Sequence, residues 1–155
     1  MWSLEDRFVA QMQLLVTASV SAFRSRIESP NDSLELVDMP RFAVGELGVR
    51  GLSIPASMLV GLDGTALERI RDEADRARCP TLLLFEDEGF DLGTADSATR
   101  AAAVDRIGRL ARAASMLGCA NLGIACTGPD EEVRFDLAAV ALREVMQRID
   151  RHDVN

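Results

Sequence analysis

The sequence predicts an α/β fold made of parallel (β/α) repeats, with four βα units following one another along the chain. The first observation is that three segments share one layout, in which a helix end, a short link and an apolar strand follow one another: GELG-VRGLSI, DRAR-CPTLLL and SMLG-CANLGI. The second is that long amphipathic helical patterns separate these strands. Strands that alternate with long helices indicate a parallel sheet with right-handed crossovers.

The first unit allows two interpretations, because residues 34–37 read either as a strand or as the first turn of a helix. We favour a strand over 14–19, a polar loop with the sequence SRIESPND, and a helix over 34–47 that ends at Gly48. Pro40 then lies in the first turns of this helix, where proline is tolerated.

The next three units follow a common pattern, in which each helix has apolar side chains on one face and charged ones opposite. Asp63 or Thr65 is the expected N-cap of the first of these helices, and Asp136 that of the last. Gly118 ends the middle one and leads directly into a strand. The predicted strands are 49–54, 81–86 and 120–126, and the predicted helices are 64–78, 96–117 and 135–150.

The length of 155 residues suits one hydrophobic core, so we expect a single domain over 14–155, preceded by a short helix or extension over 1–13. The N-terminus lacks the basic start and the small-residue cleavage site of a signal peptide. No apolar run approaches the roughly 18 residues that a membrane-spanning helix needs. We therefore expect a soluble, cytoplasmic protein with no membrane contact.

Composition excludes several classes of function. The net charge is −8 and no basic cluster interrupts it, so we expect no nucleic-acid partner. All 17 basic residues are arginine, which excludes mechanisms that use a Schiff-base or P-loop lysine. Cys79, Cys119 and Cys126 show no C-x-x-C spacing, so we expect buried free thiols rather than disulfides or a zinc site.

A resemblance to a known family rests on three segments: VDMPRFAVGELGVRGLSI, LERIRDEADRARCPTLLL and RLARAASMLGCANLGIACTG. In these segments the sequence resembles the sugar phosphate isomerase/epimerase family, which has the xylose-isomerase-like TIM barrel fold. The resemblance covers about 14–153 but only the N-terminal half of such a barrel, because a complete barrel has eight βα units and about 250 residues. It therefore implies half of a TIM barrel.

The resemblance also implies a chemistry, which is metal-assisted isomerisation or epimerisation of a sugar or sugar phosphate by proton transfer. In the complete barrel a divalent metal (Mn, Mg, Zn or Co) is implied on the later strands. The present chain is therefore expected to hold no metal ligands and no cofactor, and to be inactive alone. Many relatives have an acid where Ser53 stands in GLSIP.

Candidate site residues lie directly after each apolar strand, because parallel α/β folds place their chemistry at the carboxyl ends of strands. From these positions we expect substrate contacts from Ser53, Glu86 and Thr127, whereas the catalytic residues are unknown. Cys126 lacks a histidine that could activate it, so a packed thiol is favoured over a nucleophile. The full set of strand-end candidates is Ser19, Ser21, Ser53, Glu86, Asp87, Glu88, Cys126 and Thr127.

Several motifs have a simpler interpretation beside the functional one. The acids of FEDEG could bind a cation or hold one carboxyl protonated, but a solvated acidic loop is favoured. ACTGPDEEV could be a phosphate loop, but its three acids favour a turn before a helix. His152 lies in the last turn of the predicted final helix, where a surface role is favoured over a catalytic one.

Three hypotheses of function remain after these exclusions. The first is the N-terminal half of the isomerase/epimerase-like barrel. The second is a non-catalytic α/β module that self-associates through its open sheet edges, giving a homo-oligomer. The third, a flavodoxin-like nucleotide or flavin binder, is disfavoured because no glycine-rich loop follows the first strand.

Overall fold

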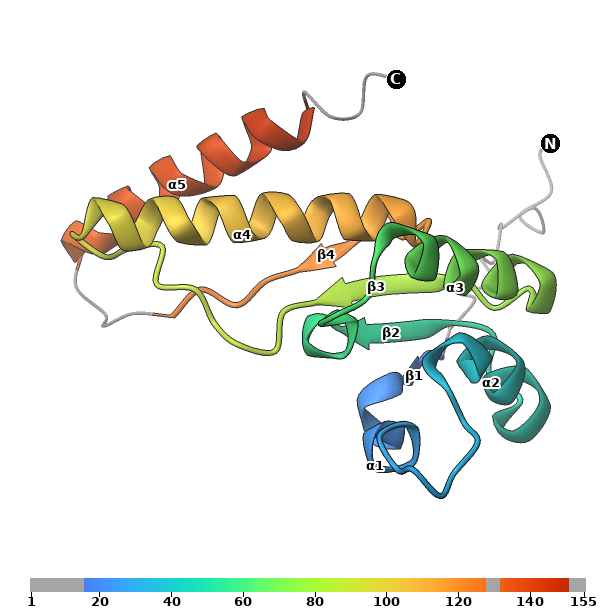
Figure 1. Cartoon of the computed structure of the whole chain (residues 1–155). Helices are drawn as coiled ribbons and strands as arrows, with labels where there is room; N and C mark the ends of the chain where they lie inside the picture. Colours follow the sequence, from blue (N-terminus) through green and yellow to red (C-terminus); the bar gives the residue numbers. More distant parts are fainter. Residues whose placement is uncertain (1–15, 128–131, 151–155) are drawn as a thin grey trace, which may run out of the picture.

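A computed structural model describes residues 16–127 and 132–150 of the chain. The predictions for residues 1–13 and for His152 lie outside these described residues. Figure 1 shows a sheet covered by helices, with α4 and α5 side by side at one end and β1 at the other. Four parallel strands form the sheet in the order β1-β2-β3-β4, as the predicted (β/α) repeats require.

The elements follow the predicted order of four βα units, with short 3-10 helices (η) after two of the strands and before α2. In chain order they are β1 (Ala18–Ser19), η1 (Val20–Phe23), α1 (Arg24–Ile27), η2 (Leu36–Asp38), α2 (Met39–Leu47), β2 (Leu52–Pro55), η3 (Ala56–Leu59), α3 (Gly64–Ala77), β3 (Thr81–Phe85), α4 (Ser97–Met116), β4 (Leu122–Gly123) and α5 (Glu132–Asp150).

The first unit differs in detail from the prediction. The segment predicted as a polar loop begins with the short helix α1, and the predicted helix 34–47 starts as the 3-10 turn η2 before α2. Residues 36–38 are thus helical rather than a strand, which agrees with the favoured interpretation. The Asp38 carboxylate accepts from the Glu35 N–H at 3.3 Å, and Pro40 lies at the start of α2.

The repeated helix-to-strand links share one hydrogen-bond pattern. The N–H of Cys79 donates to the carbonyl of Ala74 at 2.9 Å, and that of Cys119 donates to the carbonyl of Ala114 at 2.8 Å. Such a bond, which spans five residues, closes a helix whose last turn is followed by a left-handed residue. Arg78 and Gly118 take that conformation, with φ of 53° and 67°. The common sequence layout therefore reflects a common exit from each helix.

The helix starts test the predicted caps. The Asp63 carboxylate accepts from the N–H of Ala66 at 2.8 Å, which confirms Asp63 as the N-cap of α3. Asp96 caps α4 in the same way. The prediction for Asp136 is wrong, because α5 begins at Glu132 and Asp136 therefore lies inside the helix.

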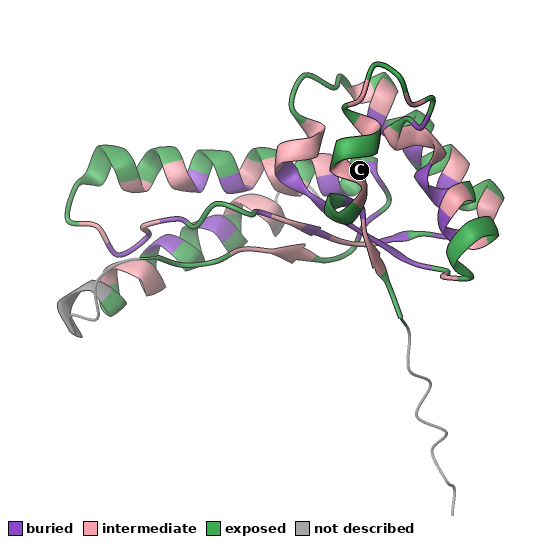
Figure 2. Cartoon of the chain, turned by 90° about the horizontal axis from the view of Figure 1, so that it is seen from below, coloured by how far each residue is buried: buried purple, intermediate pink, exposed green. Residues whose placement is uncertain are grey.

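Two hydrophobic clusters hold the longer helices to the sheet and to one another, and Figure 2 shows buried residues along the strands and on parts of these helices. The N-terminal core joins the strands to α2, α3 and the end of α4, with the buried residues Val20, Leu34, Met39, Ala43, Leu52, Ile54, Ala56, Leu67, Ile70, Cys79, Leu84, Ala114, Leu117 and Cys119. The C-terminal cluster joins α4 to α5 and to the loop after β3, with Phe90, Leu92, Val104, Ile107, Ala141 and Val145.

The last strand is much shorter than predicted. A strand over 120–126 was expected, but only Leu122–Gly123 pairs with β3, and Cys126 forms an isolated bridge with Phe90. A strand at the edge of a sheet has a neighbour on one side only, so little holds its outer residues in place. Cys126 is consequently exposed, which corrects the expectation of a buried thiol, whereas Cys79 and Cys119 are buried as predicted.

Candidate functional site

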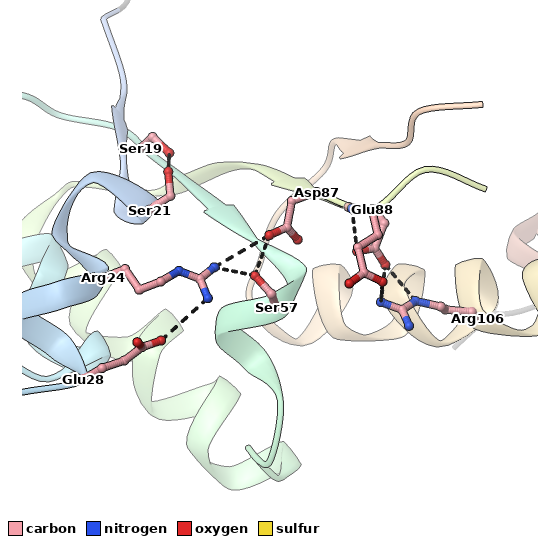
Figure 3. Close-up of polar contacts among 9 residues, drawn as sticks. Ser19, Ser21, Arg24, Glu28, Ser57, Asp87, Glu88 and Arg106 are labelled. Carbon is pink, nitrogen blue, oxygen red and sulfur yellow. Dashed lines mark hydrogen bonds and ion pairs between the residues drawn. The ribbon is translucent and has the colours of Figure 1, made fainter. Parts of the chain in front are cut away.

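The carboxyl ends of β1, β2 and β3 bring together a polar cluster of Arg24, Ser57 and Asp87, shown in Figure 3. Arg24 Nη2 donates to Ser57 Oγ at 2.5 Å, and Ser57 Oγ donates to Asp87 Oδ2 at 2.6 Å. Arg24 Nη2 also lies 3.6 Å from Asp87 Oδ2. The Ser57 hydroxyl thus bridges the two charged groups, since it accepts a hydrogen bond from the Arg24 guanidinium and donates one to the Asp87 carboxylate.

Each member of this cluster is positioned by a turn that directly follows a strand. Arg24 begins α1 after β1 and η1, Ser57 lies in η3 after β2, and Asp87 lies two residues beyond the end of β3. Because the three strands are parallel and adjacent, these turns lie together at the carboxyl-terminal end of the sheet. About a third of the Arg24 and Asp87 side chains is exposed, so a ligand can reach both.

The charge state of Asp87 follows from these contacts. The hydrogen bond from Ser57 lowers the pKa of the Asp87 carboxyl, and the positive charge of Arg24 contributes in the same direction. Asp87 is therefore ionised at neutral pH and can only accept hydrogen bonds. The idea that a carboxyl of FEDEG is held protonated does not hold for this residue.

Glu86 points to the opposite side of the sheet, toward α4. Its side chain is 1% exposed, and Arg106 of α4 contacts Glu86 Oε2 through Nε at 2.8 Å and Nη2 at 2.7 Å. Glu86 Oε1 accepts from the N–H of Glu88 at 3.3 Å. Neighbouring acids of FEDEG thus pair with different arginines. Arg106 forms an ion pair with Glu86, and Arg24 forms one with Asp87 on the other side of the sheet.

The alternation of side chains along β2 and β3 explains this division. Ile54 and Leu84 belong to the N-terminal core and face the helices, so Ser53 and Phe85 face the opposite side of the sheet. The same alternation, continued past the strand, places Glu86 on the helix side and Asp87 on that opposite side. Of the strand-end acids, Asp87 is thus the one directed toward the site.

The other two predicted contact residues occupy separate places. Ser53 is buried on β2 and is in register with Ser19 of β1. The Thr127 N–H donates to the Phe90 carbonyl at 2.8 Å, and its side chain packs so closely on Gly89 that a Cβ there would lie 2.0 Å from Thr127 Cγ2. Among the described residues, no hydrogen bond joins Ser53, Glu86 and Thr127 to one another.

Sequence reasoning missed Arg24 and Ser57. Ser57 lies two residues after the end of β2, and Arg24 falls at the border of the segment predicted as a loop. The sequence candidates ended at Ser21 after the first strand and at Ser53 in the second, so they passed over both. Their common position, shortly after the ends of two neighbouring parallel strands, is the sequence signal that points to them.

Within residues 16–127 and 132–150, no group of three or more His, Cys, Asp or Glu side chains is arranged to hold a metal ion. The described residues therefore do not form a site for a divalent metal, which the resemblance implies on the later strands of the complete barrel. Burial raises the pKa of the Cys79 thiol, so this thiol stays protonated at neutral pH.

In the described part of the chain, no helix is both long and apolar enough to cross a bilayer.

Solved structures share this arrangement of strands and helices. A D-psicose 3-epimerase from Clostridium cellulolyticum H10, solved with D-tagatose, matches with a TM-score of 0.70 and 14% identity over 87% of this chain and 48% of its own. A probable 3-DHS dehydratase of petrobactin synthesis from Bacillus anthracis gives 0.68 and 12%, over 90% and 50%. A xylose isomerase domain protein from Planctomyces limnophilus gives 0.54 and 18%, over 88% and 49%.

The chain spans about half the length of the solved structures it matches. Neither the comparison with family models nor that with curated proteins gives a match. The parallel four-stranded sheet and these neighbours together define the class: the chain has the fold of one half of a TIM barrel. The neighbours that share this fold include a D-psicose 3-epimerase and a xylose isomerase domain protein.

Proposed function

We propose that this chain is the N-terminal half of a sugar isomerase/epimerase-type barrel, that its strand ends contact the sugar, and that it is inactive alone. One observation carries the proposal: about nine-tenths of the chain superposes on about half of an epimerase and of a dehydratase. The first of these is a D-psicose 3-epimerase solved in the presence of D-fructose. A chain with four of eight βα units has half of the strand ends that surround a barrel site.

The described residues suit sugar hydroxyls better than they suit proton transfer. Asp87, held ionised by Ser57 and Arg24, accepts a hydrogen bond from a substrate hydroxyl. Ser53 and Thr127 supply hydroxyls that both donate and accept. Glu86 contacts a sugar only if Arg106 turns away from it, so Asp87 takes the role of the carboxylate contact in this proposal.

In this proposal, the groups that carry out the proton transfer lie in the other half of the complete barrel. A divalent metal and a general acid/base pair, bound or carried there, would supply the isomerisation or epimerisation step. The substrate class is a ketose or a sugar phosphate, and the place of action is the cytoplasm. In this division of labour, the present chain binds and orients the sugar and does not transform it.

To test this proposal, the purified 155-residue chain is mixed with D-fructose or D-tagatose, and both sugar conversion and sugar binding are measured by NMR. With Mn²⁺, Mg²⁺, Zn²⁺ or Co²⁺ added in turn, we expect no epimer above the level formed by the metal alone. In ¹⁵N–¹H spectra without metal, we expect the amide signals of Ser53, Asp87 and Thr127 to shift with millimolar affinity, which corresponds to about 4 kcal/mol.

A matched pair of variants makes the binding result specific. Ser53→Ala should weaken the shifts at the strand ends, whereas Ser115→Ala, an exposed position near the end of α4, should leave them unchanged. Metal-dependent turnover by this chain alone would overturn the assignment of half an active site. Ketose shifts that spread over the surface, or that survive Ser53→Ala unchanged, would overturn the strand-end site.

A further inference from the structure

Helix α5 has two apolar flanks, and only one of them is covered within the described residues. Ala138, Ala141, Val145 and Ile149 pack in the C-terminal cluster against α4. A second stripe consists of Phe135, Leu142 and Met146, which are 78%, 36% and 56% exposed. Positions separated by seven and four residues lie on one side of a helix, so this stripe forms a continuous flank, here called the open flank.

The covered flank of α5 borders the end of the sheet. Leu122 of β4 and Ile124 pack in the same cluster as the covered flank of α5, so the helix and the last strand lie together. Within the described residues, β4 pairs with β3 alone, and β1 at the other edge pairs with β2 alone. On the β1 side, Val16 is 60% exposed. Among the described residues, both edges of the sheet thus have backbone groups without a strand partner, with exposed apolar side chains nearby.

The number and direction of the strands restrict what fits these edges. All four strands are parallel, and the structural neighbours are about twice as long as this chain. A two-fold axis along the centre of the barrel places β4 of one copy beside β1 of another, in parallel, and does so twice. Eight parallel strands then close, and both edges of both copies are paired at once.

We propose that a second copy of this chain docks on the open flank and on the two sheet edges, forming a closed eight-stranded dimer. The open flank of α5 then covers β1 of the partner, including the region of Val16. The inference rests on the sheet and not on sugar binding, so it stands independently of the proposed function. A metal-bearing second half would compete with the second copy for the same edges.

Charge sets the conditions under which this dimer forms. Each copy carries a net charge of −8, so two copies repel one another at long range. Salt screens this repulsion over about 10 Å at 0.1 M ionic strength. The dimer should therefore tighten as salt is raised from about 0.02 to 0.5 M, whereas a dimer held mainly by ion pairs would weaken.

Sedimentation velocity on the full chain tests the proposal. The chain has a mass of 16.8 kDa, and we expect a species of twice that mass as the concentration is raised to about 200 μM. Met146→Glu should weaken the dimer at least about tenfold, because a carboxylate would be buried without a partner. Val16→Glu should weaken it by a similar factor, because two-fold closure uses both edges.

The control is Val60→Glu, since Val60 is 82% exposed and lies between η3 and α3, away from both edges. This variant should dimerise as the unchanged chain does, and circular dichroism checks that all three variants fold. A monomer at every concentration would overturn the proposal. So would a dimer weakened by Met146→Glu but not by Val16→Glu, which would be a contact between α5 helices alone, or a series of larger species, which would be an open chain of copies.

Discussion

The N-terminal core and the C-terminal cluster differ in how much of each helix surface is packed against neighbouring elements. In the N-terminal core, fourteen buried residues from strands and helices pack in one continuous cluster. In the C-terminal cluster only six are buried, and α5 packs mainly on α4. The difference teaches that a helix in a parallel α/β fold needs a neighbour on each side. α3 contacts both α2 and α4, whereas α5 packs on α4 with one flank and exposes apolar residues on the other.

The largest expected effect comes from truncating one buried residue in each region. Leu84 in the N-terminal core is fully buried, and Leu84→Ala should lower the free energy of unfolding by about 4 kcal/mol. Ile107 in the C-terminal cluster is as deeply buried, but Ile107→Ala should cost about 2 kcal/mol because α5 can shift into the space. Urea unfolding followed by circular dichroism measures both values, and equal costs would break the comparison.

The ion pair of Glu86 and Arg106 ties the end of β3 to α4. Arg106→Met should cost about 2 kcal/mol, because the buried Glu86 carboxylate loses its partner. Adding Glu86→Gln should recover part of this loss, because the double variant has no unpaired charge. Urea unfolding of the two single variants and the double variant provides the cycle. If the single and double variants are equally stable, the pair does not hold β3 to α4.

Gly108 and Gly118 lie within and just after α4, and their substitution by alanine tests the packing and the exit of this helix separately. Gly118 has φ of 67° at the exit of α4 into the N-terminal core, so Gly118→Ala should cost about 1 kcal/mol. Gly108 lies inside α4 with no atom within 4 Å of an added Cβ, so Gly108→Ala should gain about 0.8 kcal/mol. Melting temperatures of the two variants should move in opposite directions. A shift of the same sign for both would contradict the role assigned to Gly118.

The smallest effect concerns Asp87 and depends on pH. Its pKa is lowered in the folded chain, so its carboxylate stabilises the fold above the unfolded pKa of about 3.9 and loses this effect as the pH falls further. Asp87→Asn should therefore be less stable than the unchanged chain at pH 7, by below about 1 kcal/mol since the site is partly exposed, and equal to it near pH 2.

Ser57→Ala is the matched variant for this pH series, because the Ser57 hydroxyl is the main cause of the lowered pKa. It should remove most of the same acid dependence. Urea unfolding at a series of pH values measures it. A difference between Asp87→Asn and the unchanged chain that persists at pH 2 would show that Asp87 acts by shape rather than by charge.

Much of the fold could be predicted because its determinants are local. Helical periodicity located α3, α4 and α5, and the repeated helix ends marked the strands that follow. β4 could not be predicted to its correct length, because the apolar run before Cys126 has the pattern of a strand, whereas pairing also depends on neighbouring strands. Within the described residues, β4 has such a neighbour only in β3. The exposure of Cys126 has the same cause.

The predicted substrate contacts of Ser53, Glu86 and Thr127 stay a prediction. Asp87 was among the strand-end candidates, and the structure places it in a polar cluster with Arg24 and Ser57. The contact among Arg24, Ser57 and Asp87 depends on three turns meeting in space, which no local pattern reports. The opposite directions of Glu86 and Asp87 follow from strand alternation, so they could have been deduced from the buried positions of β3.

We claim that, within residues 16–127 and 132–150, β2 and β3 have strand neighbours on both sides, whereas β1, β4 and the open flank of α5 lack a neighbour on one side. Amide hydrogen exchange at about 2 and 200 μM tests it most directly, since closing the open side requires a second copy. We predict that protection of β1, β4 and α5 increases with concentration while that of β2 and β3 stays constant. Equal protection of all strands at both concentrations would contradict the claim.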